Sequence, residues 1–150
     1  MIVRSSLDEM LCSVRPILTD GAMGTILHAR GAGFHTCFDA LNLSDPRLVL
    51  DIHRAYIDAR AQNIKTNTFG ANRYKLGAHG QQAMLNQINT AGAELAIRAA
   101  RASDHPVVVA GSVGPLGVRL APYGRVKPEQ ARQAFREQIA ALVAADVDLI

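Results

Sequence analysis

The stretch VVVAGSVGPLG, residues 107–117, decides the fold class of this chain. Its first four residues are continuously apolar and mostly β-branched, a pattern typical of a strand that is covered on both faces. The glycines and the serine that follow end this strand in a loop. Strands buried on both faces occur in parallel sheets that carry helices on each side, so the stretch predicts an α/β fold.

Three further short strands are predicted at 17–20 (ILTD), 63–68 (NIKTNT) and 147–150 (VDLI). Together with the strand at 107–110, their starts are 40 to 46 residues apart. Capping residues, prolines and apolar spacing predict helices before and between the strands, at 6–14, 25–30, 44–59, 81–101 and 127–143. This alternation of strands and helices requires a parallel sheet with right-handed crossover connections.

Two parallel architectures fit this order, a doubly wound open sheet and a (β/α)₈ TIM barrel. Three strands end in polar, glycine-containing loops, namely DGAMGT at 20–25, NTFGAN at 67–72 and GSVGPLG at 111–117. A doubly wound sheet concentrates its chemistry at one switch point, whereas every strand end contributes in a barrel. A complete barrel needs about 250 residues. We therefore predict the N-terminal half of a barrel, about four βα units, as one partial domain over 1–150 that is truncated in its fourth strand.

The composition of the 150 residues excludes several classes of protein. Hydrophobic residues make up 49% and charged residues 19%, which rules out an intrinsically disordered chain. The apolar runs are too short for a membrane helix and the N-terminus has no secretory apolar core, so we expect a cytoplasmic protein without membrane contact. The net charge is +3, the arginines are scattered, and there are four Phe, three Tyr and no Trp. These features argue against nucleic-acid binding.

The first two strand ends carry side chains that could bind a ligand. Asp20 ends a predicted strand and precedes Gly21, so its carboxylate could meet a ligand's ammonium group; it could equally cap the helix at 25–30. Asn67, Thr68 and Asn72 offer hydrogen-bonding side chains at the second strand end, although such residues are also common in ligand-free turns.

The third strand end offers backbone groups. Gly111, Ser112, Val113 and Gly114 could present consecutive free N–H groups to a carboxylate or a phosphate. The loop lacks the GK[ST] ending of a P-loop. His35, Cys37 and Asp39 lie close in sequence, but their spacing matches no common zinc pattern, and we predict no metal site within this chain.

Taken together, the strand ends and the segments beside them resemble a known family. The matching segments are ILTDGAMGT (17–25), CFDALNLSDPRLV (37–49), HRAYIDA (53–59), TNTFGANRYKL (66–76) and VAGSVGPLG (109–117). They are similar to the N-terminal half of homocysteine S-methyltransferases, in particular the bifunctional bacterial type in which this barrel precedes a methylenetetrahydrofolate reductase module. The resemblance covers residues 17–150.

The resemblance implies an enzyme that transfers a methyl group to the zinc-activated thiolate of homocysteine, giving methionine. It implies that Asp20, with Gly21 and Asn67, helps to bind the substrate, and that the substrate's carboxylate meets the backbone of 111–114. In this family the zinc cysteines come late in the barrel, so the resemblance implies no metal ligand among these residues and leaves the catalytic residues unknown. The methyl donor stays open between the methylfolate/cobalamin type and S-methylmethionine, with betaine also used in the family.

The chain departs from the family before the second strand, where the usual GADIIETNTF reads RAQNIKTNTF at 60–69. The replacements are Arg60, Gln62, Asn63 and Lys65. Lys65 inverts a charge at the predicted barrel end, and Asn63 puts an amide where a buried apolar side chain is expected.

Two alternatives stay open at this point. One is a non-catalytic half-barrel that binds an amino acid or assembles with itself or a second half, since unpaired strand edges favour association. The other is an unrelated barrel enzyme that uses 111–117 for phosphate.

Overall fold

The computed structural model describes residues 3–33 and 35–150, with side chains from residue 7 onward. The elements in chain order are α1 (Val3–Cys12), α2 (Gly24–Ala29), α3 (Leu41–Ser44), α4 (Pro46–Asp58), β1 (Asn63–Lys65), α5 (Arg73–Ala78), the 3₁₀ turn η1 (Gln82–Met84), α6 (Leu85–Arg101), β2 (Val108–Ala110) and α7 (Pro128–Ala144). The chain therefore has the α/β class that its sequence predicts. None of the helices in these described ranges is long and apolar enough to cross a membrane.

The sheet is parallel, and its segments lie side by side in their sequence order. β1 pairs with β2 in the register Asn63 to Val108. On one side Thr19 forms a single parallel bridge to Asn63, and on the other side Ala110 forms one to Leu149. A doubly wound sheet reverses its strand order at a switch point. No reversal occurs among these four described segments, and consecutive strands of a barrel have the same order.

The outer two of these segments are shorter than predicted. Instead of strands at 17–20 and 147–150 the structure has single bridges, and β1 has three residues instead of six. Both outer segments pair on only one side within the described chain, and neither is a buried strand, because Leu18 is 52% exposed and Ile150 is 50% exposed. Only β2 has the fully buried pattern that the sequence predicts.

Capping side chains place the starts of α4 and α5. Asp45 caps α4, where its side chain accepts a hydrogen bond from the Leu48 N–H at 3.2 Å and Pro46 occupies the first turn. The sequence analysis missed α5, which begins after Asn72 because the side chain of Asn72 accepts from the N–H groups of Tyr74 and Lys75. The predicted helix at 6–14 is shifted to Val3–Cys12, and the Ser6 side chain proposed as its cap lies outside the described side chains.

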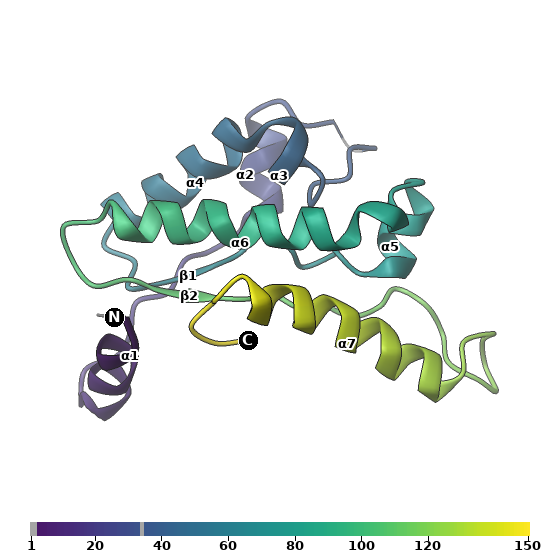
Figure 1. The fold of residues 1–150 in the computed structure, drawn as a ribbon. Helices are drawn as coiled ribbons and strands as arrows, with labels where there is room; N and C mark the ends of the chain where they lie inside the picture. Colours follow the sequence, from purple (N-terminus) through teal and green to yellow (C-terminus); the bar gives the residue numbers. More distant parts are fainter. Residues whose placement is uncertain (1–2, 34) are drawn as a thin grey trace.

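The core lies between the helices and the strands. In Figure 1, α6 runs over β1 and β2, between α4 and α7, and it contacts both helices as well as β2. Ile52, Ile64 and Val109 belong to the main cluster of buried apolar side chains there. Of the apolar residues at the end of the predicted helix at 44–59, Ala55 and Ala59 are exposed. α4 contacts α2, α3, α6 and β1, so its buried residues cover more of the helix surface than a single apolar stripe.

Candidate functional site

A cavity of about 700 Å³ lies beside the ends of the first two parallel segments. Its wall includes the loop after Asp20, the loop at 36–39 and residues on both sides of the end of β1. Of the predicted site residues, Asp20, Gly21, Asn67 and Ser112 come together on this wall. Gly111, Val113 and Gly114 do not line it.

Asp20 is buried, and its side chain is hydrogen-bonded to the last residue of β1. The residue is 6% exposed, and its Oδ2 accepts a hydrogen bond from the backbone N–H of Lys65 at 2.8 Å. The helix-capping alternative was wrong, because α2 begins after Met23 and receives no side-chain cap. The carboxylate points across to the neighbouring parallel segment instead.

Lys65 is the second partner of this carboxylate. Its Nζ lies 2.9 Å from Asp20 Oδ1 and donates to the backbone oxygen of Asp20 at 3.3 Å. The Asp20 side chain is 3% exposed and the Lys65 side chain 43% exposed, so the pair joins a buried anion to a cation that water reaches. The sequence shows the charge reversal at Lys65 but not its partner, Asp20. The partner could have been inferred from the predicted parallel strands at 17–20 and 63–68, because neighbouring strands bring their ends together.

Asn67 serves the fold as well as the cavity wall. Its Nδ2 donates to the backbone oxygen of Phe38 at 2.8 Å and to Oδ1 of Asn42 at 3.0 Å. The Nδ2 of Asn42 donates in return to the backbone oxygen of Asn67 at 2.8 Å. These bonds anchor the loop before α3 to the end of β1, and they use both N–H bonds of the Asn67 amide.

The 111–114 loop does not offer consecutive free N–H groups, which corrects the sequence-based expectation. The Gly111 N–H donates to the backbone oxygen of Leu149 at 2.7 Å, and that of Gly114 donates to the backbone oxygen of Phe69 at 3.1 Å. The Ser112 N–H donates to Thr66 Oγ1 at 2.9 Å. The loop continues the pairing of the sheet, and this consumes donors that the sequence left apparently free.

Three residues close a ring of hydrogen bonds, which we call the Thr68 ring. The Ser112 N–H donates to Thr66 Oγ1, the two threonine hydroxyls lie 2.6 Å apart, and Thr68 Oγ1 donates to the Ser112 backbone oxygen at 2.8 Å. Gln138 on α7 adds a bond from its Nε2 to the backbone oxygen of Thr68 at 2.6 Å. Thr68, a predicted ligand-binding side chain, is 0% exposed and is committed to this ring. Sequence reasoning missed Gln138.

The opposite wall carries groups that the sequence analysis did not assign to the substrate. Asp39 Oδ1 accepts from the Gly70 N–H at 2.8 Å, and burial raises the pKa of Asp39. Burial also raises the pKa of the Cys37 thiol, which disfavours a thiolate there. The ammonium of Lys75 lies 5.0 Å from the centre of the Phe69 ring.

His53 on α4 is 0% exposed, and both of its ring nitrogens are buried without a hydrogen-bond partner in the described part of the chain. Burial lowers the pKa of His53 to about 4, against the opposing pull of the Asp20 charge. This imidazole is therefore neutral at neutral pH.

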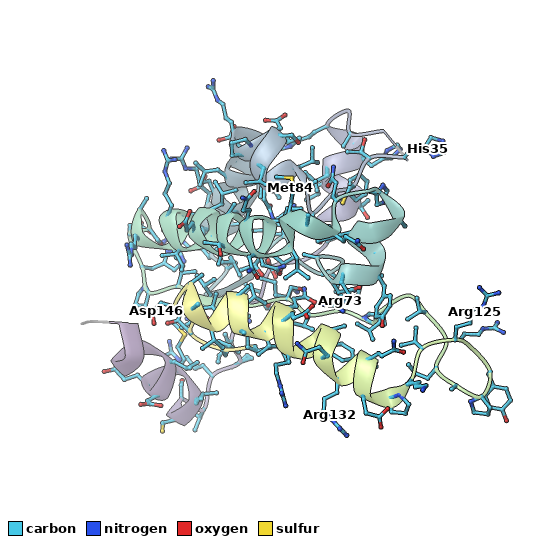
Figure 2. The ribbon with its side chains drawn as sticks, turned by 45° about the vertical axis from the view of Figure 1, so that its right-hand side comes forward. His35, Arg73, Met84, Arg125, Arg132 and Asp146 are labelled. Atoms are coloured by element: carbon cyan, nitrogen blue, oxygen red, sulfur yellow. The ribbon has the colours of Figure 1, made fainter. Side chains whose placement is uncertain are left out.

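A metal site does not form from the described residues. Within 3–33 and 35–150, no group of three or more His, Cys, Asp or Glu side chains could hold a metal ion. His35 is exposed and points outward in Figure 2, and it does not line the cavity whose wall includes Cys37 and Asp39. The zinc that the resemblance implies therefore does not fit this set of residues.

Comparison with known proteins gives a consistent set of relatives. The sequence model of the family described as homocysteine S-methyltransferase matches residues 17–150. The methionine synthase of Mycobacterium tuberculosis is 32% identical over 147 residues, which cover 92% of this chain and 12% of that protein. The homocysteine S-methyltransferase of Escherichia coli is 32% identical over 149 residues, which cover 89% of this chain and 48% of that protein. The chain thus spans less than half the length of either relative.

Solved structures agree with these matches. The oxidized form of the homocysteine methyltransferase MmuM from Escherichia coli matches with a TM-score of 0.79 and 29% identity, covering 94% of this chain and 54% of that one. Its metallated form matches with a TM-score of 0.78 and 30% identity, covering 98% and 55%. The metal is a property of that protein.

Proposed function

The chain belongs to the homocysteine S-methyltransferase family, and from this premise we propose that its cavity binds homocysteine for transfer of a methyl group to the sulfur, giving methionine. One observation carries the proposal: Asp20, in the matching segment 17–25, presents a buried carboxylate on the wall of a cavity beside parallel strand ends. Buried charged groups of this kind fix the orientation of a small ligand.

The same premise extends to the architecture. We propose that the four parallel segments are the first part of a (β/α)₈ barrel, about its first half. The proposal is supported by their consecutive order and by the coverage of 54% of the MmuM chain. In a barrel the strand ends face one common site, which places the cavity where such enzymes bind substrate.

In this proposal each residue on the wall has a separate task. Asp20 binds the α-ammonium of homocysteine by a charge-assisted hydrogen bond. Ser112 is the member of the 111–114 loop that lies on the cavity wall, and its N–H is already bonded to Thr66 Oγ1, so no free N–H of Ser112 is assigned to the substrate's carboxylate. Gly21 lies on the wall next to Asp20, where a Cβ would come within 3.0 Å of the Tyr56 hydroxyl, and Asn67 holds the loop before α3 in place. The reaction forms a bond between the substrate's sulfur and the methyl carbon, breaks the bond between that carbon and the donor, and releases the proton of the thiol.

No step is derived through zinc, because the described residues provide no ligand set for it. The type of methyl donor stays open. The cytoplasmic location, the absence of nucleic-acid and membrane partners and the self-association through open strand edges stay predictions.

The experiment that tests the proposal compares two ligands by calorimetry under reducing conditions. L-Homocysteine carries the α-ammonium, and 4-mercaptobutyrate is the same molecule without it. We expect the wild-type chain to prefer homocysteine and Asp20→Asn to lose about thirtyfold in homocysteine affinity, since truncating one member of a buried charge pair costs about 2 kcal/mol or more. The affinity of Asp20→Asn for 4-mercaptobutyrate should change little. Equal binding of both ligands by the wild-type chain would contradict the proposal.

A further inference from the structure

The cavity contains a cation of its own at the carboxylate that is proposed to bind the substrate. Lys65 Nζ lies 2.9 Å from Asp20 Oδ1 and 3.3 Å from the backbone oxygen of Asp20. The other carboxylate oxygen, Oδ2, accepts from the Lys65 backbone N–H at 2.8 Å. Both carboxylate oxygens are therefore engaged by one residue of the same chain.

The two contacts of Lys65 differ in what they do. The backbone bond to Oδ2 fixes the direction of the carboxylate and is independent of the side chain at position 65. The ammonium adds charge neutralisation at Oδ1, the oxygen that a ligand's ammonium would need. The position of Asp20 thus does not require the ammonium, whereas access to Asp20 depends on it.

The ammonium can leave without a change in the fold. The Lys65 side chain is 43% exposed, and its flexible stem can carry the charge into water. The carboxylate cannot follow, because the Asp20 side chain is 3% exposed. Departure of Lys65 therefore leaves a buried, uncompensated charge that only another cation can neutralise.

We propose that Lys65 is a built-in competitor of the substrate: its ammonium occupies the place of the ligand's α-ammonium on Asp20, so that homocysteine binds only when Lys65 swings away. The proposal rests on the proposed function and adds a residue that sets its affinity and specificity. The apparent dissociation constant equals the intrinsic one divided by the fraction of molecules in which Asp20 is free. Ligands without an ammonium group do not meet this competition.

The test is a calorimetric comparison of the wild-type chain with Lys65→Met, which keeps the length of the stem and the backbone N–H but removes the charge. We expect Lys65→Met to bind L-homocysteine about tenfold more tightly, the factor for a pair that is closed in about nine molecules of ten. Binding of 4-mercaptobutyrate should not tighten. Lys65→Arg keeps a cation at this position and should show no tenfold gain.

Two controls separate competition from a general change in the cavity. Lys75→Met removes another lysine of the same wall that has no contact with Asp20, and it should bring no tenfold gain. In an Asp20→Asn background, Lys65→Met should bring no gain either, because the contested charge is gone.

The outcomes distinguish this inference from the proposed function. Tighter binding by Lys65→Met that depends on Asp20 supports both. Homocysteine binding that is equal or weaker in Lys65→Met overturns the competitor and leaves the proposed function standing. A lack of homocysteine binding by both proteins, each verified as folded by circular dichroism, overturns the proposed function and the competitor with it.

Discussion

Two neighbouring strand ends of this molecule are held by opposite means. At Asp20 a buried carboxylate is neutralised by the ammonium of Lys65, whose side chain is about half exposed, and both residues line a cavity. At the Thr68 ring, neutral groups bond to one another inside the protein, and Gln138 on α7 adds a bond to the backbone oxygen of Thr68. The first arrangement can exchange one partner for a ligand, whereas the second is complete without one. Polar residues at a strand end can therefore form a binding site only where one hydrogen-bonding or ionic partner can be replaced by a ligand.

The largest expected effect on stability lies in the 111–114 loop, next to the Thr68 ring. A Cβ on Gly114 would lie 2.5 Å from the backbone oxygen of Phe69 and 2.7 Å from its ring, and a backbone oxygen cannot easily move. Gly114→Ala should therefore lower the free energy of unfolding by about 3 kcal/mol, measured by urea titration. Gly33→Ala is the matched control, because its Cβ would meet nothing closer than 3.6 Å. Equal effects of the two substitutions would show that the 111–114 loop is not closely packed.

The next effect is a dependence of the free energy of unfolding on pH, caused by the buried His53 of α4. An unfolded histidine titrates near pH 6.5, whereas the pKa of folded His53 is about 4, so the unfolded chain binds the extra proton between these values. Stability from His53 is complete above pH 6.5 and falls as the pH drops toward 4. We expect a loss of about 2 kcal/mol at pH 5 compared with pH 8.

The control for this effect is His53→Leu, which should lack that part of the acid destabilisation. Asp39 and Asp148, whose pKa values are raised, contribute to both proteins alike and cancel in the comparison. Parallel stability curves for the two proteins from pH 8 to pH 5 would refute a neutral, buried His53.

Breaking the Thr68 ring should cost about as much stability. Thr68→Val keeps the shape but removes the hydroxyl, so the Thr66 hydroxyl and the Ser112 backbone oxygen each lose a buried partner. A loss of about 2 kcal/mol in the free energy of unfolding is expected from thermal or urea denaturation. The same substitution at the exposed Thr25 should stay within about 0.5 kcal/mol. A neutral Thr68→Val would mean that the ring does not stabilise this side.

The smallest effect on stability is expected at the pair of Asp20 and Lys65. Lys65→Met should lower the free energy of unfolding by about 1.4 kcal/mol, because a pair that is closed in about nine molecules of ten is favoured about tenfold and the Lys65 side chain is 43% exposed. Chemical denaturation measures this directly. A loss of several kcal/mol would show that Lys65 is a structural support and that Asp20 is not open to exchange.

The sequence predicts the fold class because its signals are local. The apolar run at 107–110 and the proline-started helices at 46 and 128 appear in the structure as β2, α4 and α7. The strand lengths at 17–20 and 147–150 could not be predicted, since they depend on whether a neighbour covers the outer edge. That neighbour is not a property of the local pattern.

The site is predicted less completely, because its chemistry depends on pairs from different strands. The resemblance places Asp20 and Ser112, and both lie on the cavity wall. The partners of these residues could not be found from spacing alone: Lys65 is 45 residues from Asp20, and Gln138 is 70 residues from Thr68. Free donors in a loop such as 111–114 cannot be told from paired ones before the sheet is known.

The most direct test of the central claim is a titration of the ¹⁵N-labelled chain with L-homocysteine, observed through its amide resonances. The Lys65 N–H donates to Asp20 Oδ2, so its resonance reports on the carboxylate itself. We predict that the Lys65 and Gly21 resonances shift together and saturate with one dissociation constant, while those of Thr68 and Gly114 stay in place. Saturable shifts confined to residues away from Asp20 would contradict the assignment of this cavity as the homocysteine site.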